Sequence, residues 1–345
     1  MSDRFATRLL KWFDVHGRHD LPWQHPRTPY RVWLSEIMLQ QTQVSVVTGY
    51  FQRFVDALPD LPALAAAPPD QVLALWSGLG YYARARNLHA TAHRCVELHD
   101  GDLPRDFDAL LALPGIGRST AGAILAQAWG DRFAILDGNV KRLLARYHGI
   151  EGWPGTPTIE KRMWALANSH LPDSRLADFT QAQMDLGATL CTRSNPDCAH
   201  CPLHKDCVAY STNRTASLPT PRPIKAKPER EMHVVWLEDD TGRVLLQRRP
   251  PTGVWASLWS LPQFEAIAAR DQWLDAQGRI ASSSELESIE HVLTHFRLSL
   301  HPLHARLAAP KPRLGDNDDH RWVARSELAT LGIPAPIRRL LESTS

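Results

Sequence analysis

The stretch "LPGIGRST", residues 113–120, decides how the first part of this chain is interpreted. It joins two short segments, 104–113 and 119–130, whose apolar spacing predicts helices. A plain turn needs one glycine, whereas this turn has both Gly115 and Gly117. Glycines permit positive φ and a close approach to the backbone, and the unpaired amides at the start of the next helix suit an anion. The turn is therefore either an ordinary helix cap or a site for a phosphate group.

The composition sets broad limits on the class of protein. The chain has 345 residues, of which 43% are hydrophobic and 22% charged, and its net charge is +2. These values are typical of globular proteins, and the length favours two domains. No apolar run is long enough for a membrane span, and the polar N-terminus is unlike a signal peptide. We therefore expect a cytoplasmic protein with no membrane partner, and the charge alone does not indicate nucleic acid.

Two sequence patterns divide the chain. Residues 1–215 repeat apolar side chains at helical spacing. Residues 216–230 are rich in Pro and Lys and predict a linker. Residues 231–345 contain alternating segments typical of strands, and they begin with a hairpin pattern at 232–250 around the turn EDDTG. The sequence thus predicts an all-α domain followed by an α+β domain.

Four of the five cysteines are crowded into one segment, where gaps of six, two and five residues separate Cys191, Cys198, Cys201 and Cys207. In a cytoplasmic chain such clustering favours metal over disulfides. Zinc favours two tight pairs joined by a longer spacer, whereas a 4Fe–4S cluster is larger and accommodates unequal spacing. The spacing therefore favours a 4Fe–4S cluster, with zinc and unrelated thiols as alternatives.

The cysteine spacing and the LPGIG turn together resemble the helix–hairpin–helix DNA glycosylases of the endonuclease III superfamily. Further segments resemble the adenine glycosylases of that superfamily, namely LPWQ (21–24), VWLSEIMLQQTQV (32–44), GLGYYARARNL (78–88) and ILDGNVKR (135–142). The resemblance covers nearly the whole chain. It implies a glycosylase domain with an iron–sulfur loop, and then a Nudix-like domain. The implied partner is double-stranded DNA with adenine opposite 8-oxoguanine or guanine, bound by a monomer.

Two carboxylates are candidates for the chemistry. Cleavage of an N-glycosidic bond passes through an oxocarbenium-like state, so it needs an acid for the leaving base and a negative charge near the sugar. Glu36 lies in an apolar helical segment, where burial raises a carboxyl pKa, although a solvated helix residue is the alternative. Asp137 stands where a helix beginning near Val140 needs an N-cap. The resemblance implies that Glu36 protonates adenine N7 and activates water, that Asp137 stabilises the cation, and that Asn139 holds Asp137 or the water.

One position departs from part of the superfamily. Relatives that also cut the DNA strand have a lysine just after L-P-G-x-G-x, and this lysine forms a Schiff base with the sugar. Here that position is Ser119. We therefore expect base removal without strong lyase activity.

The target base must leave the duplex, and side chains must then fill the gap. The resemblance implies that Gln41, with Thr42 beside it, and Tyr81 insert around the orphaned partner base. Arg84 and Arg86 are candidates for phosphate contacts, with a solvated helix face as the alternative.

The second domain resembles the Nudix fold, but the Arg-Glu-x-x-Glu-Glu run that holds magnesium in that family is absent from the sequence. We therefore expect this domain to bind rather than to hydrolyse. A Phe-Ser-His loop inspects 8-oxoguanine in adenine glycosylases, and the corresponding residues here are Leu293, Thr294 and His295. The alternatives for the whole chain are another mismatch or oxidised-pyrimidine glycosylase, or a non-catalytic iron–sulfur scaffold that binds DNA.

Overall fold

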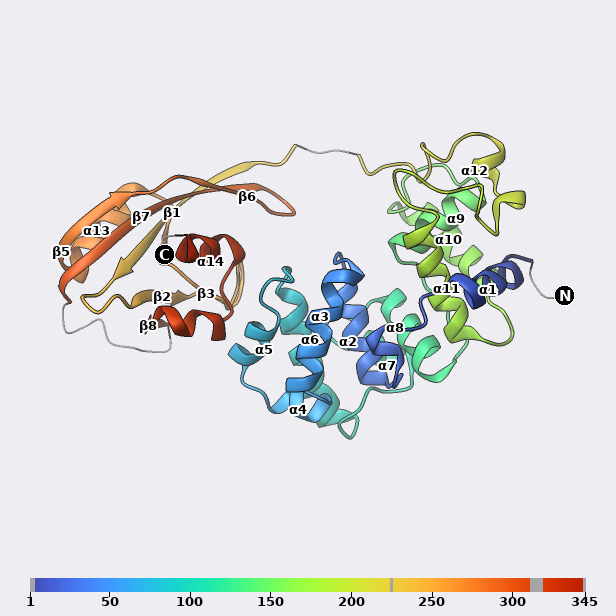
Figure 1. Ribbon diagram of the computed structural model, residues 1–345, viewed down its shortest axis with the longest axis horizontal. Coiled ribbons are helices and arrows are strands. Elements are labelled where there is room, and N and C mark those ends of the chain that lie inside the picture. Colours follow the sequence, from blue (N-terminus) through green and yellow to red (C-terminus); the bar gives the residue numbers. More distant parts are fainter. Residues whose placement is uncertain (1–3, 224–225, 311–318, 344–345) are drawn as a thin grey trace. The chain divides into compact units, whose positions relative to one another are not determined.

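The structure, a computed structural model, describes residues 4–223, 226–310 and 319–343 (Figure 1). Contacts divide the chain into two units. The first, which we call the helical unit, combines residues 1–66 with 87–224, and the second, the sheet unit, combines residues 67–86 with 225–345. A helical part followed by a part with a sheet confirms the predicted fold class. The inclusion of residues 67–86 in the sheet unit was not predicted.

The helical unit consists of helices joined by short turns (Figure 1). Its α-helices are α1 (Arg4–His16), α2 (Pro29–Leu39), α3 (Val44–Ala57), α4 (Leu61–Ala66), α6 (Ala83–Leu98, whose first residues belong to the sheet unit), α7 (Phe107–Leu111), α8 (Arg118–Ile124), α9 (Gly138–Tyr147), α10 (Pro157–Ser169), α11 (Leu176–Thr189) and α12 (Val208–Ser211). Two 3₁₀ turns lie at η1 (Pro22–Gln24) and η3 (His204–Asp206), and α8 continues into a π-helix, η2 (Leu125–Trp129).

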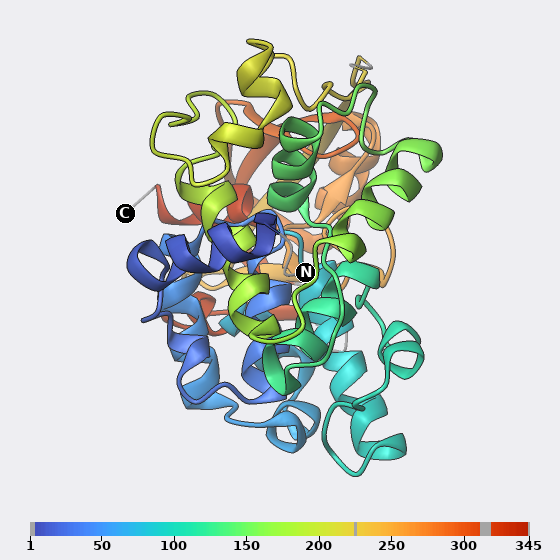
Figure 2. The same cartoon turned by 90° about the vertical axis from the view of Figure 1, so that its right-hand side faces the viewer.

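One apolar core joins α1, α9, α10 and α11. The ribbons of α1 (dark blue) and α11 (yellow-green) can be followed in Figure 2. Phe5 of α1, Val140 of α9, Met163 of α10 and Phe179 of α11 are all buried in it. α1 and α10 expose polar residues on their outer faces, so their helical spacing of apolar residues corresponds to this core, whereas α11 is buried along most of its length. The end of α11 leads directly into the cysteine segment, which the core therefore supports.

The sheet unit is built on eight strands in its described part. They are β1 (Glu229–Glu238), β2 (Val244–Arg248), β3 (Trp259–Ser260), β4 (Gln263–Phe264), β5 (Gly278–Glu285), β6 (Ile289–Val292), β7 (Arg297–Pro310) and β8 (His320–Val323). The main order is β3-β2-β1-β7-β5, in which β1 and β7 are parallel. Glu238 pairs with Val244 across the β1–β2 hairpin, which confirms the hairpin predicted at 232–250.

Helices cover both faces of this sheet. The remaining helices of the unit are α5 (Pro69–Leu75), α13 (Ile267–Gln277), η4 (Arg325–Thr330) and α14 (Ala335–Glu342). Alternate residues of β1 point to opposite faces. Trp236 shares a core with Ile337 of α14, whereas Leu237 shares the other core with Leu274 of α13.

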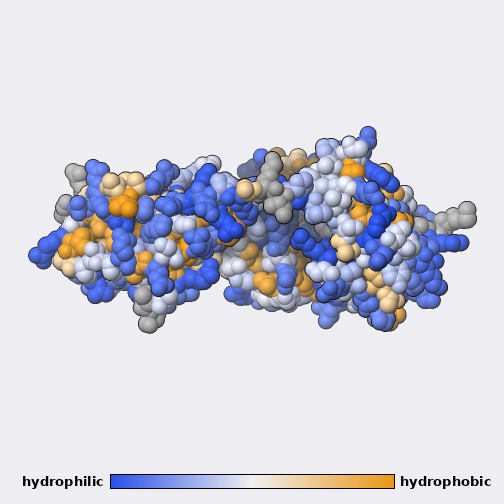
Figure 3. Space-filling model, turned by 90° about the horizontal axis from the view of Figure 1, so that it is seen from above, coloured by the Kyte–Doolittle hydropathy of each residue, from blue (hydrophilic) through white to orange (hydrophobic). Residues whose placement is uncertain are grey.

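The surface offers few clues to function. The face in Figure 3 is mostly hydrophilic, with apolar residues scattered among polar ones, as is normal for a globular protein. Within the described residues, every helix is too short or too polar to cross a membrane. The buried polar side chains of the helical unit say more about function than this surface does.

Candidate active site

Glu36 lies on α2, and a hydrogen bond fixes its carboxyl group. Gln127 Nε2 donates to Glu36 Oε1 at 2.9 Å. Gln127 is itself buried and belongs to the π-helix η2. A π-helical turn shifts the direction of the side chains that follow, and such turns are frequent at functional sites. Sequence spacing did not indicate Gln127, because an α-helical pattern does not show where the helix widens.

Asp137 caps helix α9, as its position in the sequence predicted. Its Oδ1 accepts from Val140 N at 2.8 Å, and Asn139 Nδ2 donates to Oδ2 at 3.4 Å. Ser119 Oγ accepts from Leu136 N at 2.9 Å, so this hydroxyl holds the strand-like segment that leads into Asp137. The capping role and a catalytic role are therefore compatible, because only one carboxylate oxygen is used by the cap.

The two carboxylates influence each other. Burial raises the pKa of Glu36 to about 7, the negative charge of Asp137 raises it too, and the hydrogen bond from Gln127 lowers it. Burial also raises the pKa of Asp137, but the bond from Val140, the charge of Arg142 and the bonds from Asn139 all oppose that rise. More groups stabilise the negative charge of Asp137 than that of Glu36. Glu36 is therefore the carboxyl that keeps its proton near neutral pH.

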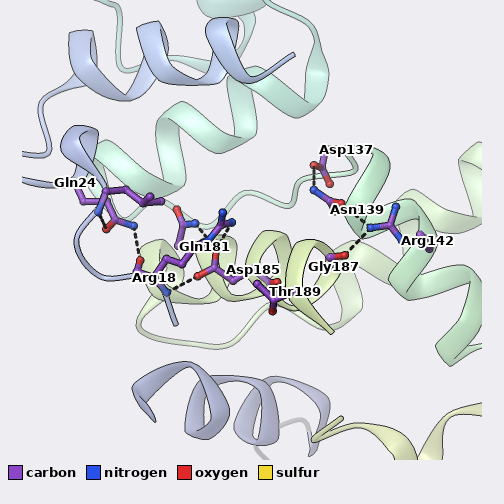
Figure 4. Close-up of polar contacts among 10 residues, drawn as sticks. Arg18, Gln24, Asp137, Asn139, Arg142, Gln181, Asp185, Gly187 and Thr189 are labelled. Atoms are coloured by element: carbon purple, nitrogen blue, oxygen red, sulfur yellow. Dashed lines mark hydrogen bonds and ion pairs between the residues drawn. The ribbon is translucent and has the colours of Figure 1, made fainter. Parts of the chain in front are cut away.

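Asn139 is part of a chain of polar contacts that ends at the cysteine segment (Figure 4). Arg142 Nη2 donates to Asn139 Oδ1 at 2.7 Å and to Gly187 O at 2.6 Å, and its Nε donates to Cys191 O at 2.7 Å. A Cβ on Gly187 would lie 2.6 Å from Asn139 Cβ, so a glycine is needed where α11 meets α9. These contacts were not predicted.

A second polar group anchors the LPWQ segment to α11 (Figure 4). Asp185 is fully buried and accepts from Arg18 N at 2.8 Å, from Arg18 Nη2 at 2.6 Å and from Gln181 Nε2 at 2.8 Å. Gln24 Nε2 then donates to Arg18 O at 3.1 Å. A buried carboxylate needs such pairing, since an unpaired one is strongly destabilising.

The hairpin at residues 114–117 joins α7 to α8. Its two glycines differ in backbone conformation and in the space beside them. Gly115 has φ 79°, and a Cβ there would lie 2.9 Å from Asn87 Cβ. Gly117 is the N-cap of α8 with φ −92°, and among the described residues no heavy atom lies within 4 Å of an added Cβ. The basic residue that follows, Arg118, stacks 4.0 Å from the ring centroid of Trp164. Gly115 is thus required by the turn itself, whereas Gly117 leaves a backbone approachable from outside.

Gln41 and Tyr81 share an unusual backbone conformation. Both are exposed, and their φ angles are 60° and 49°. Non-glycine residues seldom adopt positive φ, and those that do gather at functional sites. Thr42 lies in the turn after α2, where its Oγ1 donates to Gln40 O at 3.4 Å.

Neither arginine near Tyr81 is a solvated side chain. Arg84 is 7% exposed, and its Nη2 donates to the carbonyls of Leu79 and Gly80, both at 3.1 Å. Arg86 Nη1 donates to Ala256 O at 2.8 Å. Arg84 is thus buried and bonded within the protein, which disfavours a phosphate contact, whereas Arg86 is half-buried and its contact with phosphate stays a prediction.

The four clustered cysteines line one pocket together with apolar side chains such as Leu143 and Leu203. Arg146, a buried residue of α9, donates to Cys191 Sγ at 3.4 Å and to Thr192 O at 2.7 Å. Burial raises the pKa of Cys201 to about 12, and the other three thiols add to this rise. Within the described residues, no three Cys, His, Asp or Glu side chains converge as a single metal ion would require.

The predicted lesion loop is the turn between β6 and β7. Leu293 N donates to Phe296 O at 2.9 Å, and Thr294 and His295 are exposed between them. Leu293 and Phe296 pack against the core of the sheet unit. The two polar side chains are therefore presented at the tip of a hairpin.

Comparisons with known proteins show the family of both parts of the chain. Residues 34–169 match the family model described as HhH-GPD superfamily base excision DNA repair protein, and residues 233–343 match the NUDIX domain. The adenine DNA glycosylase of Buchnera aphidicola subsp. Acyrthosiphon pisum is 35% identical over 98% of this chain and 97% of its own length. That of Homo sapiens is 30% identical over 97% of this chain and 73% of its own length.

Solved structures show the same helical fold. A thermostable thymine-DNA glycosylase is 28% identical, with a TM-score of 0.56 over 60% of this chain and 95% of its own. A non-covalent endonuclease III–DNA complex is 20% identical, with a TM-score of 0.52 over 62% of this chain and 99% of its own, and it supports the fold alone. Only the adenine-specific relatives among these match both units of the chain. Because that similarity extends along nearly its whole length, this chain belongs to the adenine DNA glycosylases, enzymes that act on DNA in base excision repair.

Proposed function

We propose that this enzyme removes adenine paired with 8-oxoguanine or guanine, with Glu36 as the general acid and Asp137 as the stabilising charge. The observation that carries the proposal is the burial of Glu36 near a second carboxylate, Asp137, because burial and that negative charge raise the pKa of Glu36 to about 7. The bond from Gln127 Nε2 opposes this rise but fixes the direction of the carboxyl group. Glu36 donates its proton to N7 of the flipped adenine, and the electrons of the breaking bond go to the base. Asp137 stabilises the resulting sugar cation. Glu36, now ionised, takes a proton from the attacking water.

Exposure and backbone geometry support the DNA contacts that we propose. The open approach to Gly117 supports binding of a phosphate by the hairpin amides, which positions the enzyme without reading sequence. The exposed, left-handed Gln41 and Tyr81 are the side chains that we assign to the gap left by the flipped base, with Thr42 supporting the turn of Gln41. Thr294 and His295 are assigned to the partner base, since a hydroxyl and an imidazole at a hairpin tip present hydrogen-bonding groups.

The cysteine pocket fits a 4Fe–4S cluster. Four thiols share one pocket, and four thiolates are the ligand set of such a cluster. Burial, and to a smaller extent the neighbouring thiols, raise the pKa of Cys201 and Cys207, so a cationic group is needed to hold these thiols as thiolates. Such a cluster, when bound, would fix the 191–207 segment, and the chemistry on the base stays with Glu36 and Asp137.

Single-turnover base release tests the assignment. Wild-type protein is expected to release adenine opposite 8-oxoguanine and opposite guanine, and to leave thymine opposite guanine intact. Glu36→Gln keeps the shape but cannot deliver a proton, so release should fall about 10²–10⁴-fold while DNA affinity is retained. Glu97→Gln, an exposed carboxylate on α6, is the matched control. Normal release by Glu36→Gln, or preferential release of thymine, would refute the proposal.

Two further experiments test lesion recognition and monofunctional action separately. Thr294→Ala should reduce the preference for 8-oxoguanine over guanine, and an unchanged preference would remove this hairpin from lesion recognition. Borohydride should trap little covalent complex, because Ser119 has no amine and its Oγ is already bonded to Leu136 N. Efficient trapping of the unmodified protein would contradict monofunctional action.

A further inference from the structure

Tyr81 lies in a turn that belongs to the sheet unit, together with residues 225–345. The turn has its own internal bonds, since Trp76 Nε1 and Arg84 Nη2 each donate to Gly80 O at 3.1 Å. Tyr81 itself is 49% exposed. These bonds set the shape of the turn, whereas its position in the unit depends on a separate group of contacts.

Two side chains just after Tyr81 donate to main-chain carbonyls of the same unit. Tyr82 Oη donates to Ile333 O at 3.2 Å, and Arg86 Nη1 donates to Ala256 O at 2.8 Å. Main-chain acceptors in a packed domain have fixed positions, so these bonds locate the chain that follows the turn.

Contacts before the turn involve α5. Asp70 Oδ2 accepts from Arg248 Nη2 at 2.8 Å and from Trp259 Nε1 at 3.3 Å. A Cβ on Gly332 would lie 2.8 Å from Leu73 Cβ, so the backbone at Gly332 packs closely against α5. The turn is thus anchored to residues 248–259 and 332–333 on both of its sides.

We propose that residues 225–345 position Tyr81, so that the domain carrying the lesion hairpin also fixes a side chain that enters the DNA. Tyr82 and Arg86 are the positioning residues. Tyr82 adjoins Tyr81, so a bond at its hydroxyl restricts the backbone that sets the direction of Tyr81. The inference rests on the proposed role of Tyr81 in DNA, and its test has one part that is independent of that role.

Hydrogen exchange of the full-length protein without DNA tests the positioning directly. Tyr82→Phe removes the bond to Ile333 O at 3.2 Å and a 3.4 Å contact with Ser77 Oγ, and it should speed exchange of the amides in residues 77–82 by about fivefold. Arg86→Ala should have a similar effect. Tyr30→Phe is the matched control, because Tyr30 Oη donates to Leu58 O at 2.6 Å in the helical unit and its loss should leave this turn unchanged. Unchanged exchange of the turn in both Tyr82→Phe and Arg86→Ala would overturn the inference.

A double-mutant cycle tests whether Tyr82 acts through Tyr81. Affinity is measured for a duplex with adenine opposite 8-oxoguanine, with Glu36→Gln present in every protein to prevent turnover. Tyr82→Phe should weaken binding about fivefold when Tyr81 is present and have no further effect in a Tyr81→Ala background. Additive losses would overturn the inference. If Tyr81→Ala alone leaves binding unchanged, the DNA role of Tyr81 fails, and the exchange result alone decides the positioning.

Discussion

The proton on Glu36 is the single-residue feature on which the site depends most. Its pKa rises from 4.5 to about 7, because burial disfavours the charged form. Glu36 must be protonated to act as an acid, so the single-turnover rate should fall as the pH rises above about 7. A rate that stays flat to pH 9 would show that another group delivers the proton.

The same shift predicts how stability depends on pH. The folded chain binds this proton more tightly than the unfolded chain, so the contribution of Glu36 to stability is complete below pH 4.5 and is lost as the pH rises through 7. Glu36→Gln cannot ionise and should therefore raise the free energy of unfolding at pH 8 by about 3 kcal/mol, with a much smaller gain at pH 5. Urea unfolding at both pH values measures this, and Glu97→Gln controls for the loss of one charge. An equal gain at the two pH values would contradict the assigned cause.

Sequence reasoning proposed Glu36 and Asp137 as the catalytic carboxylates and Asn139 as a partner of Asp137, but it did not indicate the partner of Glu36. Glu36 and Asp137 stand in segments with a recognisable pattern, whereas Gln127 faces Glu36 only because α8 widens into a π-helix. For Arg84, the sequence pattern suggested a role that its burial disfavours. Basic residues in the sequence ARAR suggest a phosphate contact, yet Arg84 is buried because two carbonyls of the neighbouring turn need a donor.

At the scale of one structural element, the hairpin between α7 and α8 allows a prediction in which its two glycines behave differently. Gly115→Ala should destabilise the fold, since a side chain there meets both a positive φ of 79° and Asn87 at 2.9 Å. Gly117→Ala should leave stability unchanged, because its φ of −92° is ordinary and the space beside it is open. It should instead weaken DNA binding about tenfold, by blocking hydrogen bonds between the amides and a phosphate.

Thermal unfolding and duplex affinity at one fixed salt concentration distinguish these two effects. Gly49→Ala is the control for Gly117→Ala, because Gly49 of α3 also faces open space among the described residues. If Gly117→Ala binds DNA as tightly as wild type, the hairpin is an ordinary helix cap and the phosphate assignment fails.

Local patterns predicted the elements better than their pairing. The β1–β2 hairpin was visible in the sequence, since its two strands flank one turn. The parallel pairing of β1 with β7 joins Glu229 to Arg297, and no short-range signal reveals such a distant pair. The placement of residues 67–86 in the sheet unit was missed for the same reason, because it depends on Asp70, Tyr82 and Arg86 meeting partners far along the chain.

At the scale of the whole molecule, the cysteine segment joins parts of the helical unit that are far apart in sequence. Arg146 of α9 donates to Thr192 O in that segment and, at 2.9 Å, to Leu218 O beyond it. Arg142 ties Cys191 O to Asn139 Oδ1 next to Asp137. A group bound by the four thiols would therefore brace α9 and α11, and Leu203 of the segment also packs into the apolar core of these helices.

The metal content of the purified protein tests this view of the molecule. We expect a brown protein with about four irons per chain, because four thiolates hold one 4Fe–4S cluster. Cys198→Ser removes a thiol that lines the pocket and should lose most of the iron and the visible absorption, together with DNA affinity. The apolar core lies largely outside the 191–207 segment, so helical circular dichroism should be largely retained. Cys95→Ser is the matched control, because Cys95 is fully buried on α6, is absent from that pocket and should leave the iron content unchanged. One zinc per chain with no visible absorption would instead show that the pocket holds a single ion, and the 4Fe–4S assignment would fall.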